Sequence, residues 1–325
     1  MTSPFDGFEV EKRMRPSARG SAFDLDQALA SVVILHARIP ADAFTARALG
    51  AERLGNGIVI GSNGLVLTIG YLITEADDVT LITNDERRVP AHVLGYDQVS
   101  GLGLVQALEP LDLPALPLGD SRHLHSEDPI ILAGGGGLPH AIVGRVLGRQ
   151  PFAGYWEYLL DEALFTGPGH PHWSGAALIG PSGALMGVGS LQMTQLTPSG
   201  EPAPINMCVP IELLPPILDD LSRGRQVHPP RPWLGVLSHD GDETITVVDV
   251  SPDGPAARAE IRQGDVILAV AGQPVTSLAE FYTKLWGLGP AGVVAPLRIK
   301  RENDTFDLEV RTIDRASKLK KRRFN

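Results

Sequence analysis

Short apolar runs separated by turn residues recur along most of the chain, and this spacing constrains the fold more than any other feature. From Ala28 onward, runs such as Leu65–Ile69, Leu102–Val105 and Ile142–Leu147 follow one another, with glycine-, asparagine- or proline-bearing turns between them. A spacing of roughly 8–12 residues between strands is typical of all-β sandwiches and barrels. The 36 Gly and 27 Pro also favour tight turns over long helices. The sequence therefore predicts a mainly β protein.

Length, charge and cysteine content narrow the class of protein further. A chain of 325 residues accommodates two or three domains at roughly 100–200 residues each. The formal net charge of −10 argues against nucleic acid as a main partner, because phosphate binding needs a basic surface. Cys208 is the single cysteine, so no intrachain disulfide is possible, and we expect a small buried hydrophobe there. No metal-ligand spacing stands out, and we expect neither a metal nor another cofactor.

The N-terminus and the hydropathy bear on location. Residues 1–24 are polar, lack the apolar core of a secretory signal and are expected to form a loose arm. No run reaches the roughly 18 apolar residues needed to span a bilayer. We therefore expect a cytoplasmic protein with no membrane span, or a periplasmic one if the start site is mis-assigned. The basic tail at residues 315–325 is expected to be a frayed end, the alternative being an electrostatic contact with anionic lipid or RNA.

The style of the pattern changes about two thirds of the way along the chain. Residues 25–224 carry the β pattern and end in an amphipathic helix expected over 210–224, which contains a Pro-Pro pair. Residues 225–232 are proline-rich and are expected to be a linker. Residues 233–314 mix strands with a helix opened by a capping box at Ser277 and running to about Trp286. The sequence thus predicts two domains, with the arm and the tail at the ends.

The start of the second domain has the features of a peptide-binding loop. A glycine in a short apolar loop before a strand leaves backbone N–H groups free for a carboxylate, and the strand edge can accept a peptide as an added strand. The candidate residues are Trp233, Leu234, Gly235 and Val236. Leu278, Phe281 and Leu285 share one helix face, which is either a groove wall or part of the core.

Three segments of this domain, found in order, resemble the PDZ domain of HtrA-family proteases. They are Trp233–Val236, Val250–Ala256 and Ile261–Gly272. The resemblance implies an α+β PDZ fold in which Leu234, Gly235 and Val236 supply the carboxylate-binding loop and strand edge. It implies peptides, unfolded protein segments or C-termini as partners. The alternative is a PDZ fold used only for packing or for regulating a trimer.

Residues 25–222 resemble the HtrA protease domain, a trypsin-like double six-stranded β-barrel. Gly55–Ile60 is similar to the family's glycine-rich first strand, Asn63–Thr68 to its next hairpin, and Pro204–Pro210 to its closing strand. The resemblance implies a homo-oligomer, a trimer in the family, with the N-terminal arm as the contact.

The triad positions depart from the family pattern. A serine nucleophile needs a histidine to accept its proton and an acid to orient that histidine. The resemblance places Ser174 at the nucleophile, but Tyr71 at the histidine position and Gly101 at the aspartate position. His172 replaces a glycine of the oxyanion hole, whose donors would be the His172 and Ser174 backbone N–H groups. A tyrosine with an ordinary pKa of about 10 does not serve as a base near pH 7.

The sequence leaves three functions open. The losses at Tyr71 and Gly101 beside an intact PDZ signature favour a catalytically inactive protease homologue that binds peptides. A serine endopeptidase would have to use Ser174 with an unusual base such as His170 or His172. A structural partner of an active HtrA protease in mixed oligomers is neither supported nor excluded.

Overall fold

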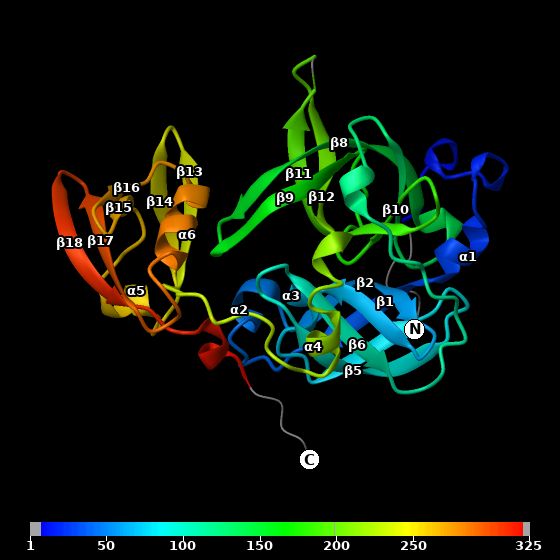
Figure 1. Cartoon of the computed structure of the whole chain (residues 1–325), viewed down its shortest axis with the longest axis horizontal. Coiled ribbons are helices and arrows are strands. Elements are labelled where there is room, and N and C mark those ends of the chain that lie inside the picture. The colour runs from blue at the N-terminus through cyan, green and yellow to red at the C-terminus, as the bar shows by residue number, and fades with distance from the viewer. Residues whose placement is uncertain (1–7, 198, 321–325) are drawn as a thin grey trace. The chain divides into compact units, whose positions relative to one another are not determined.

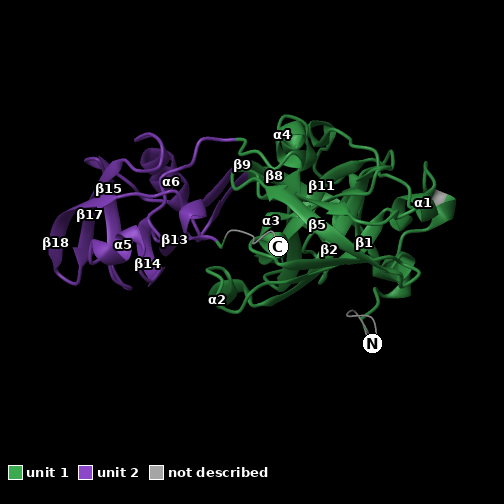
Figure 2. Cartoon of the chain, turned by 90° about the horizontal axis from the view of Figure 1, so that it is seen from below, with its two compact units in different colours: residues 1–150, 162–227, 320–325 green, residues 151–161, 228–319 purple. Residues whose placement is uncertain are grey.

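The computed structural model describes residues 8–197 and 199–320, which fall into two compact units. The first unit comprises residues 1–150, 162–227 and 320–325, and the second comprises residues 151–161 and 228–319 (Figure 2). Segment 151–161 lies inside the predicted first domain but groups with the second unit, which no sequence pattern had indicated.

The first half of unit 1 is a closed β-barrel with the strand order β1-β2-β3-β6-β5-β4 (Figure 1). Its strands are β1 (Val32–Arg38), β2 (Glu52–Gly61), β3 (Leu65–Ile69), β4 (Asp78–Ile82), β5 (Arg88–Tyr96) and β6 (Leu102–Ala107). Valine, leucine and isoleucine dominate these strands and fill the barrel, as β-branched and aliphatic residues do on a half-buried pleated surface. Short helices α1 (Leu25–Ala30), α2 (Ala46–Leu49) and α3 (Gly70–Ile73) flank the strands in sequence.

The second half of unit 1 is another closed barrel, with the order β10-β11-β12-β9-β8-β7 (Figure 1). Its strands are β7 (Pro129–Ala133), β8 (Ala141–Gly154), β9 (Tyr158–Gly167), β10 (Ala177–Ile179), β11 (Leu185–Leu196) and β12 (Pro202–Pro210). Cys208 packs in this core, and burial raises the pKa of its thiol to about 12. The predicted pair of six-stranded barrels is confirmed.

The described part of the N-terminal segment is not a loose arm. It contains short 3-10 helices at Lys12–Met14 and Ala18–Gly20. Val10 is buried in the second barrel's core, and its N–H donates to the carbonyl oxygen of Pro139 at 2.8 Å. Burial of apolar surface holds this segment in place, against the expectation from its polar composition. The first seven residues of the predicted arm lie outside the described residues.

The helix predicted over 210–224 is interrupted. The structure has a 3-10 turn at Ile211–Leu213 and the short helix α4 (Leu218–Ser222). Pro215 and Pro216 lie between them, and a proline ring removes a backbone donor and obstructs the preceding turn of an α-helix. Further 3-10 turns occur at Ser121–His123, Leu138–His140 and Arg315–Lys318.

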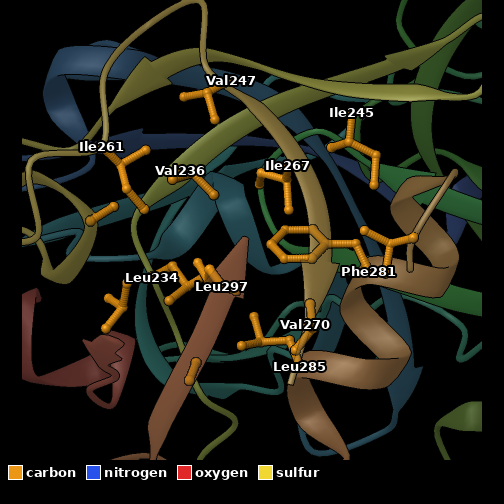
Figure 3. Close-up of a cluster of buried hydrophobic side chains, with 14 of the residues drawn as sticks. Leu234, Val236, Ile245, Val247, Ile261, Ile267, Val270, Phe281, Leu285 and Leu297 are labelled. Carbon is orange, nitrogen blue, oxygen red and sulfur yellow. The ribbon is translucent and has the colours of Figure 1, made fainter. Parts of the chain in front are cut away.

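Unit 2 is built around an antiparallel sheet with the order β13-β14-β15-β17-β18, to which β16 is added beside β15. Its strands are β13 (Val236–Gly241), β14 (Thr244–Val250), β15 (Val266–Val270), β16 (Gln273–Pro274), β17 (Val294–Arg301) and β18 (Asp304–Arg311). The helices are α5 (Pro255–Arg258) and α6 (Leu278–Trp286), and the predicted cap of α6 is present, with Ser277 accepting from the Glu280 N–H. Phe281 and Leu285 of α6 lie beside Ile267 and Val270 of β15 in one buried cluster (Figure 3).

Among the described residues, no helix is both long enough and apolar enough to cross a membrane. The tail is tied down at its described end. The Lys320 N–H donates to the Glu75 carboxylate at 2.7 Å, and its ammonium group pairs with Asp42. The frayed end that the sequence predicts therefore does not begin before Lys320, and the last five residues lie outside the described part.

Candidate active site and peptide-binding loop

Asn56 in β2 positions the segment that carries Ser174. Its side-chain N–H groups donate to the backbone carbonyl oxygens of His172 and Ser174, both at 2.9 Å. Its backbone N–H donates to the same Ser174 carbonyl oxygen at 2.8 Å. The Asn56 amide oxygen accepts from the Gly135 N–H at 2.8 Å. Asn56 is fully buried, so each of these bonds replaces lost contact with water. Sequence reasoning missed this residue, although a polar side chain inside a glycine-rich strand was a possible signal.

Tyr71 and Ser174 are 103 positions apart in sequence, and the structure brings their hydroxyl groups together. The distance between Tyr71 Oη and Ser174 Oγ is 2.7 Å. The Tyr71 hydroxyl also donates to the carbonyl oxygen of Ser190 at 2.8 Å. A phenol has one proton, and the carbonyl can only accept. The Ser174 hydroxyl is therefore the donor in its bond with Tyr71.

Burial strengthens the hold of Tyr71 on its own proton. Desolvation of the phenol raises the pKa of Tyr71 to about 12, and the hydrogen bonds with Ser174 and Trp173 offset only part of that rise. Near pH 7 the group stays neutral. The phenol oxygen accepts a hydrogen bond from Ser174 without being able to take its proton, which a general base must do.

Gly101 lies against the short helix that carries Tyr71. Its carbonyl oxygen accepts from the Gly70 N–H at 2.7 Å, and its own N–H donates to the Asp97 carbonyl at 2.8 Å. The backbone at Gly101 has φ +80°, in the left-handed region that glycine adopts without strain. Glycine offers no side chain at this place to orient a base. The nearby Asp97 carboxylate instead accepts from the Ser100 N–H at 2.7 Å and closes the turn.

His170 is engaged through both ring nitrogens. Its Nδ1 accepts from the His172 N–H at 3.0 Å, so the proton resides on Nε2, which donates to the carbonyl oxygen of His140 at 3.0 Å. The side chain is fully buried, and desolvation lowers the pKa of His170 to about 4. This neutral imidazole holds the segment together, and neither nitrogen is directed at Ser174.

The backbone N–H of His172, predicted to be an oxyanion-hole donor, is directed elsewhere in this conformation. Its backbone N–H points to His170 Nδ1, as just described, and its ring lies against Phe8 at a centroid distance of 5.0 Å. Desolvation lowers the pKa of His172. An oxyanion hole with His172 and Ser174 as donors stays a prediction, and it requires this segment to change conformation.

No group of His, Cys, Asp or Glu that could hold a metal ion occurs in the described part of the chain.

The predicted carboxylate-binding loop in unit 2 already holds a carboxylate, that of Glu157. Glu157 Oε1 accepts from the N–H groups of Gly235 at 2.7 Å and Val236 at 3.2 Å, and Oε2 accepts from the Leu234 N–H at 3.0 Å. Trp233, the first predicted residue of the loop, is buried beside them. Sequence reasoning missed Glu157, because a glutamate in a hairpin turn is normally expected to be exposed to solvent.

The structure places Leu278 and Phe281, predicted as peptide-binding residues, in the hydrophobic core of unit 2. Leu278 is 3% exposed and Phe281 fully buried, and Leu285 on the same face is fully buried too. The core is thus the environment of this whole helix face, one of the two possibilities that the sequence left open.

Comparisons with known proteins agree with this architecture. A family model of the trypsin-like peptidase domain matches residues 55–188, and one of the PDZ domain matches residues 232–312. Over 282 residues the chain is 28% identical to serine endoprotease DegS of Escherichia coli K12, covering 81% of this chain and 77% of the relative. A solved structure described as HtrA-type protease AlgW with decapeptide superposes with a TM-score of 0.53 at 20% identity, covering 90% of this chain and 97% of that one, which supports the fold alone.

A second relative is the "Probable periplasmic serine endoprotease DegP-like" of Pseudomonas fluorescens, 27% identical over 277 residues. The match covers 80% of this chain but only 56% of that relative's length. The expected cytoplasmic location is contradicted, because this relative and others that match are named as periplasmic proteins.

Barrels, nucleophile position and C-terminal domain together define a trypsin-like serine protease homologue with a PDZ domain. The two matched domains and the DegS and DegP-like relatives support the HtrA/Deg family for this chain.

Proposed function

We propose that this chain is a non-catalytic member of the HtrA/Deg family that binds peptides or protein C-termini through its PDZ domain. One observation carries the proposal: Ser174 donates its hydrogen bond to a tyrosine that is itself protonated. Attack on an amide needs a group that removes the serine proton, and loss of triad members typically lowers turnover by about 10⁴–10⁶.

The nearby histidines do not replace the missing base in the described state. His170 uses both ring nitrogens, and the low pKa that follows from its burial disfavours the imidazolium form that a base must adopt after proton transfer. The His172 ring lies against Phe8. These contacts argue against the alternative of an active endopeptidase with an unusual base.

Support for peptide binding comes from the PDZ loop. The Leu234, Gly235 and Val236 N–H groups converge on one carboxylate, which is the arrangement that recognises a C-terminus in a backbone nest. The names of the relatives suggest a periplasmic setting for this chain, and we extend that location to it as a proposal. A trimeric assembly follows from the family resemblance and is testable by light scattering of the purified chain.

The test compares the full chain with Ser174→Ala in two assays, unfolded fluorescein-labelled casein as substrate and a fluorophosphonate probe for the serine. We expect no cleavage beyond the Ser174→Ala level and no labelling of Ser174, with trypsin as positive control in both assays. Cleavage or labelling that disappears in Ser174→Ala would overturn the proposed inactivity and favour the endopeptidase.

Peptide binding is tested separately with fluorescent decapeptides that end in Val, Leu, Phe or Ala. Each peptide is compared with its C-terminally amidated twin. We expect binding of free C-termini only, since an amide lacks the second anionic oxygen that the loop N–H groups receive. Equal binding of both forms, or of neither, would contradict recognition of C-termini.

A further inference from the structure

We propose that the hairpin tip at residues 154–157 is an intramolecular ligand of the PDZ loop, with the Glu157 side chain in the place of a peptide's terminal carboxylate. A C-terminal peptide then enters only by displacing the tip. This inference deepens the proposed peptide binding and rests on it.

The carboxylate of Glu157 is held as a bound ligand would be. It is 4% exposed, and both of its oxygens receive backbone N–H groups from the loop. Gly235 at the centre of the loop has φ +81°, and a Cβ there would lie 2.9 Å from the Trp233 ring. Glycine therefore lets the N–H groups of three successive residues converge on one anion.

The backbone of the tip adds a second feature of ligand binding. The Ser238 N–H of β13 donates to the carbonyl oxygen of Tyr155 at 3.0 Å. Tyr155 precedes Glu157 by two residues, so the tip combines a carboxylate in the loop with a main-chain bond to the adjoining strand. An extended peptide added to a sheet edge makes this same pair of contacts.

Helix α6 supplies the third side of the site. The Tyr282 hydroxyl donates to the Gly154 carbonyl oxygen at 2.8 Å and accepts from the Glu157 N–H at 3.2 Å. Trp156 stacks on Tyr158 with a centroid distance of 5.6 Å, which stiffens the hairpin. Loop, strand and helix therefore all contact the tip, as the parts of a peptide groove would contact a ligand.

A purely structural anchor would more simply be apolar, since burying a carboxylate incurs a desolvation cost. Glu157 is in addition a non-glycine residue at φ +59°, a conformation that side chains adopt with strain. Ala153 and Leu159, on either side of the tip, already pack against the unit 2 core. The carboxylate adds to this packing an occupant for the three N–H donors.

Two consequences follow for binding. Peptide and tip exclude each other, because the same N–H groups cannot satisfy two carboxylates. The apparent affinity for a peptide is therefore reduced by the fraction of molecules in which the tip is docked.

The first experiment measures peptide affinity in the full chain carrying Glu157→Ala, which removes the acceptor oxygens in both protonation states, using the free and amidated decapeptides described above. We expect the affinity for free C-termini to rise at least about tenfold, which corresponds to a tip docked in more than nine molecules of ten. Asp161→Ala is the matched control, because it removes an exposed carboxylate from the same segment, and we expect no change. Tyr282→Phe, which releases the tip without altering the loop, should also raise the affinity.

The second experiment measures hydrogen exchange of the Leu234, Gly235 and Val236 amides without peptide. Exchange should be slow in the wild type and faster in Glu157→Ala, with protection of the β15 amides unchanged as evidence of folding. Equal protection of the loop in both proteins would overturn the inference.

The two measurements separate the hypotheses. Peptides that bind the wild type and Glu157→Ala equally, through their free carboxylate, would overturn the intramolecular ligand and leave the proposed function standing. Loop amides that become exposed in Glu157→Ala while no peptide binds either protein would contradict the proposed function, and with it competition by the tip.

Discussion

The hydroxyl groups of Tyr71 and Ser174 lie 2.7 Å apart, with the serine as donor and the tyrosine as acceptor. In a working triad the partner of the serine must take up a proton in the transition state. Here the partner keeps its own proton, directed at the Ser190 carbonyl. The pair therefore acts as a cross-link between α3 and the nucleophile segment.

Replacing Tyr71 with phenylalanine should lower the free energy of unfolding by about 1–3 kcal/mol, because the buried Ser190 carbonyl loses its donor and Ser174 its acceptor. Urea unfolding followed by near-ultraviolet circular dichroism measures the loss. The control is Tyr155→Phe, since Tyr155 is 55% exposed. A Tyr71→Phe protein as stable as the wild type would contradict the cross-link.

Asn56→Ala should be more damaging, with a loss of about 2–4 kcal/mol, because it leaves several buried polar groups around Ser174 without partners. Its matched control is Asn63→Ala, an asparagine of the same barrel that is exposed to solvent. Chemical denaturation of both variants gives the comparison. Similar losses in the two would show that Asn56 does not hold the segment.

His170 predicts an acid sensitivity of unit 1. Burial lowers its pKa to about 4 from an ordinary 6.5, so between these values the unfolded chain binds a proton that the folded chain does not. The contribution of His170 to the free energy of unfolding is therefore fully present above about pH 6.5. It is lost as the pH decreases toward 4, and the loss from this group is about 2–4 kcal/mol. Denaturation midpoints across that range measure the slope. In His170→Gln the slope should be shallower, and an unchanged slope would assign the acid sensitivity to other groups.

Glu157 predicts the opposite sign for docking of the hairpin tip. Burial raises its pKa to about 7, although the loop N–H groups, and more weakly Arg315, favour the ionised form. Below pH 7 the docked tip retains a proton that the released tip loses near its ordinary pKa of 4.5. Docking should therefore weaken as the pH rises from about 5 to above 7.

Peptide affinity at several pH values checks this dependence. Tyr282 and Asp240 are the other titratable groups near the tip, and burial raises the pKa of Tyr282, so it stays neutral in this range. The ratio of affinities between Glu157→Ala and the wild type should shrink as the pH rises. A ratio that is constant with pH would refute the titration of Glu157.

The sequence anticipated much of the fold for a physical reason. Short runs of aliphatic residues between turns predict strands such as Leu65–Ile69 and Leu102–Ala107. This pattern is local, and it arises because the strand must bury its apolar side chains. The helix over 210–224 was predicted less well. Its apolar stripe favours a continuous helix and Pro215 and Pro216 disfavour one, and the surrounding packing decides which effect prevails.

The site was anticipated only where a motif marks it. The resemblance to the HtrA protease motifs points to both Tyr71 and Ser174, although 103 positions separate them. Asn56 and His170 have no such marker: one is a polar residue in a strand and the other a histidine in a loop. Their roles depend on which carbonyl and N–H groups lie beside them after the barrels close.

The amino-acid sequence by itself therefore determines the local features of this protein. These are its strands, the glycine loop before β13, and a tyrosine in place of histidine at position 71. The docking of Glu157 on the N–H groups of Leu234, Gly235 and Val236 was decided only by tertiary structure. Nearly 80 positions separate the carboxylate from these donors, and no local pattern encodes their meeting. A carboxylate remains in water unless folding brings enough donors to one point to replace its hydration, and that convergence exists only in the folded chain.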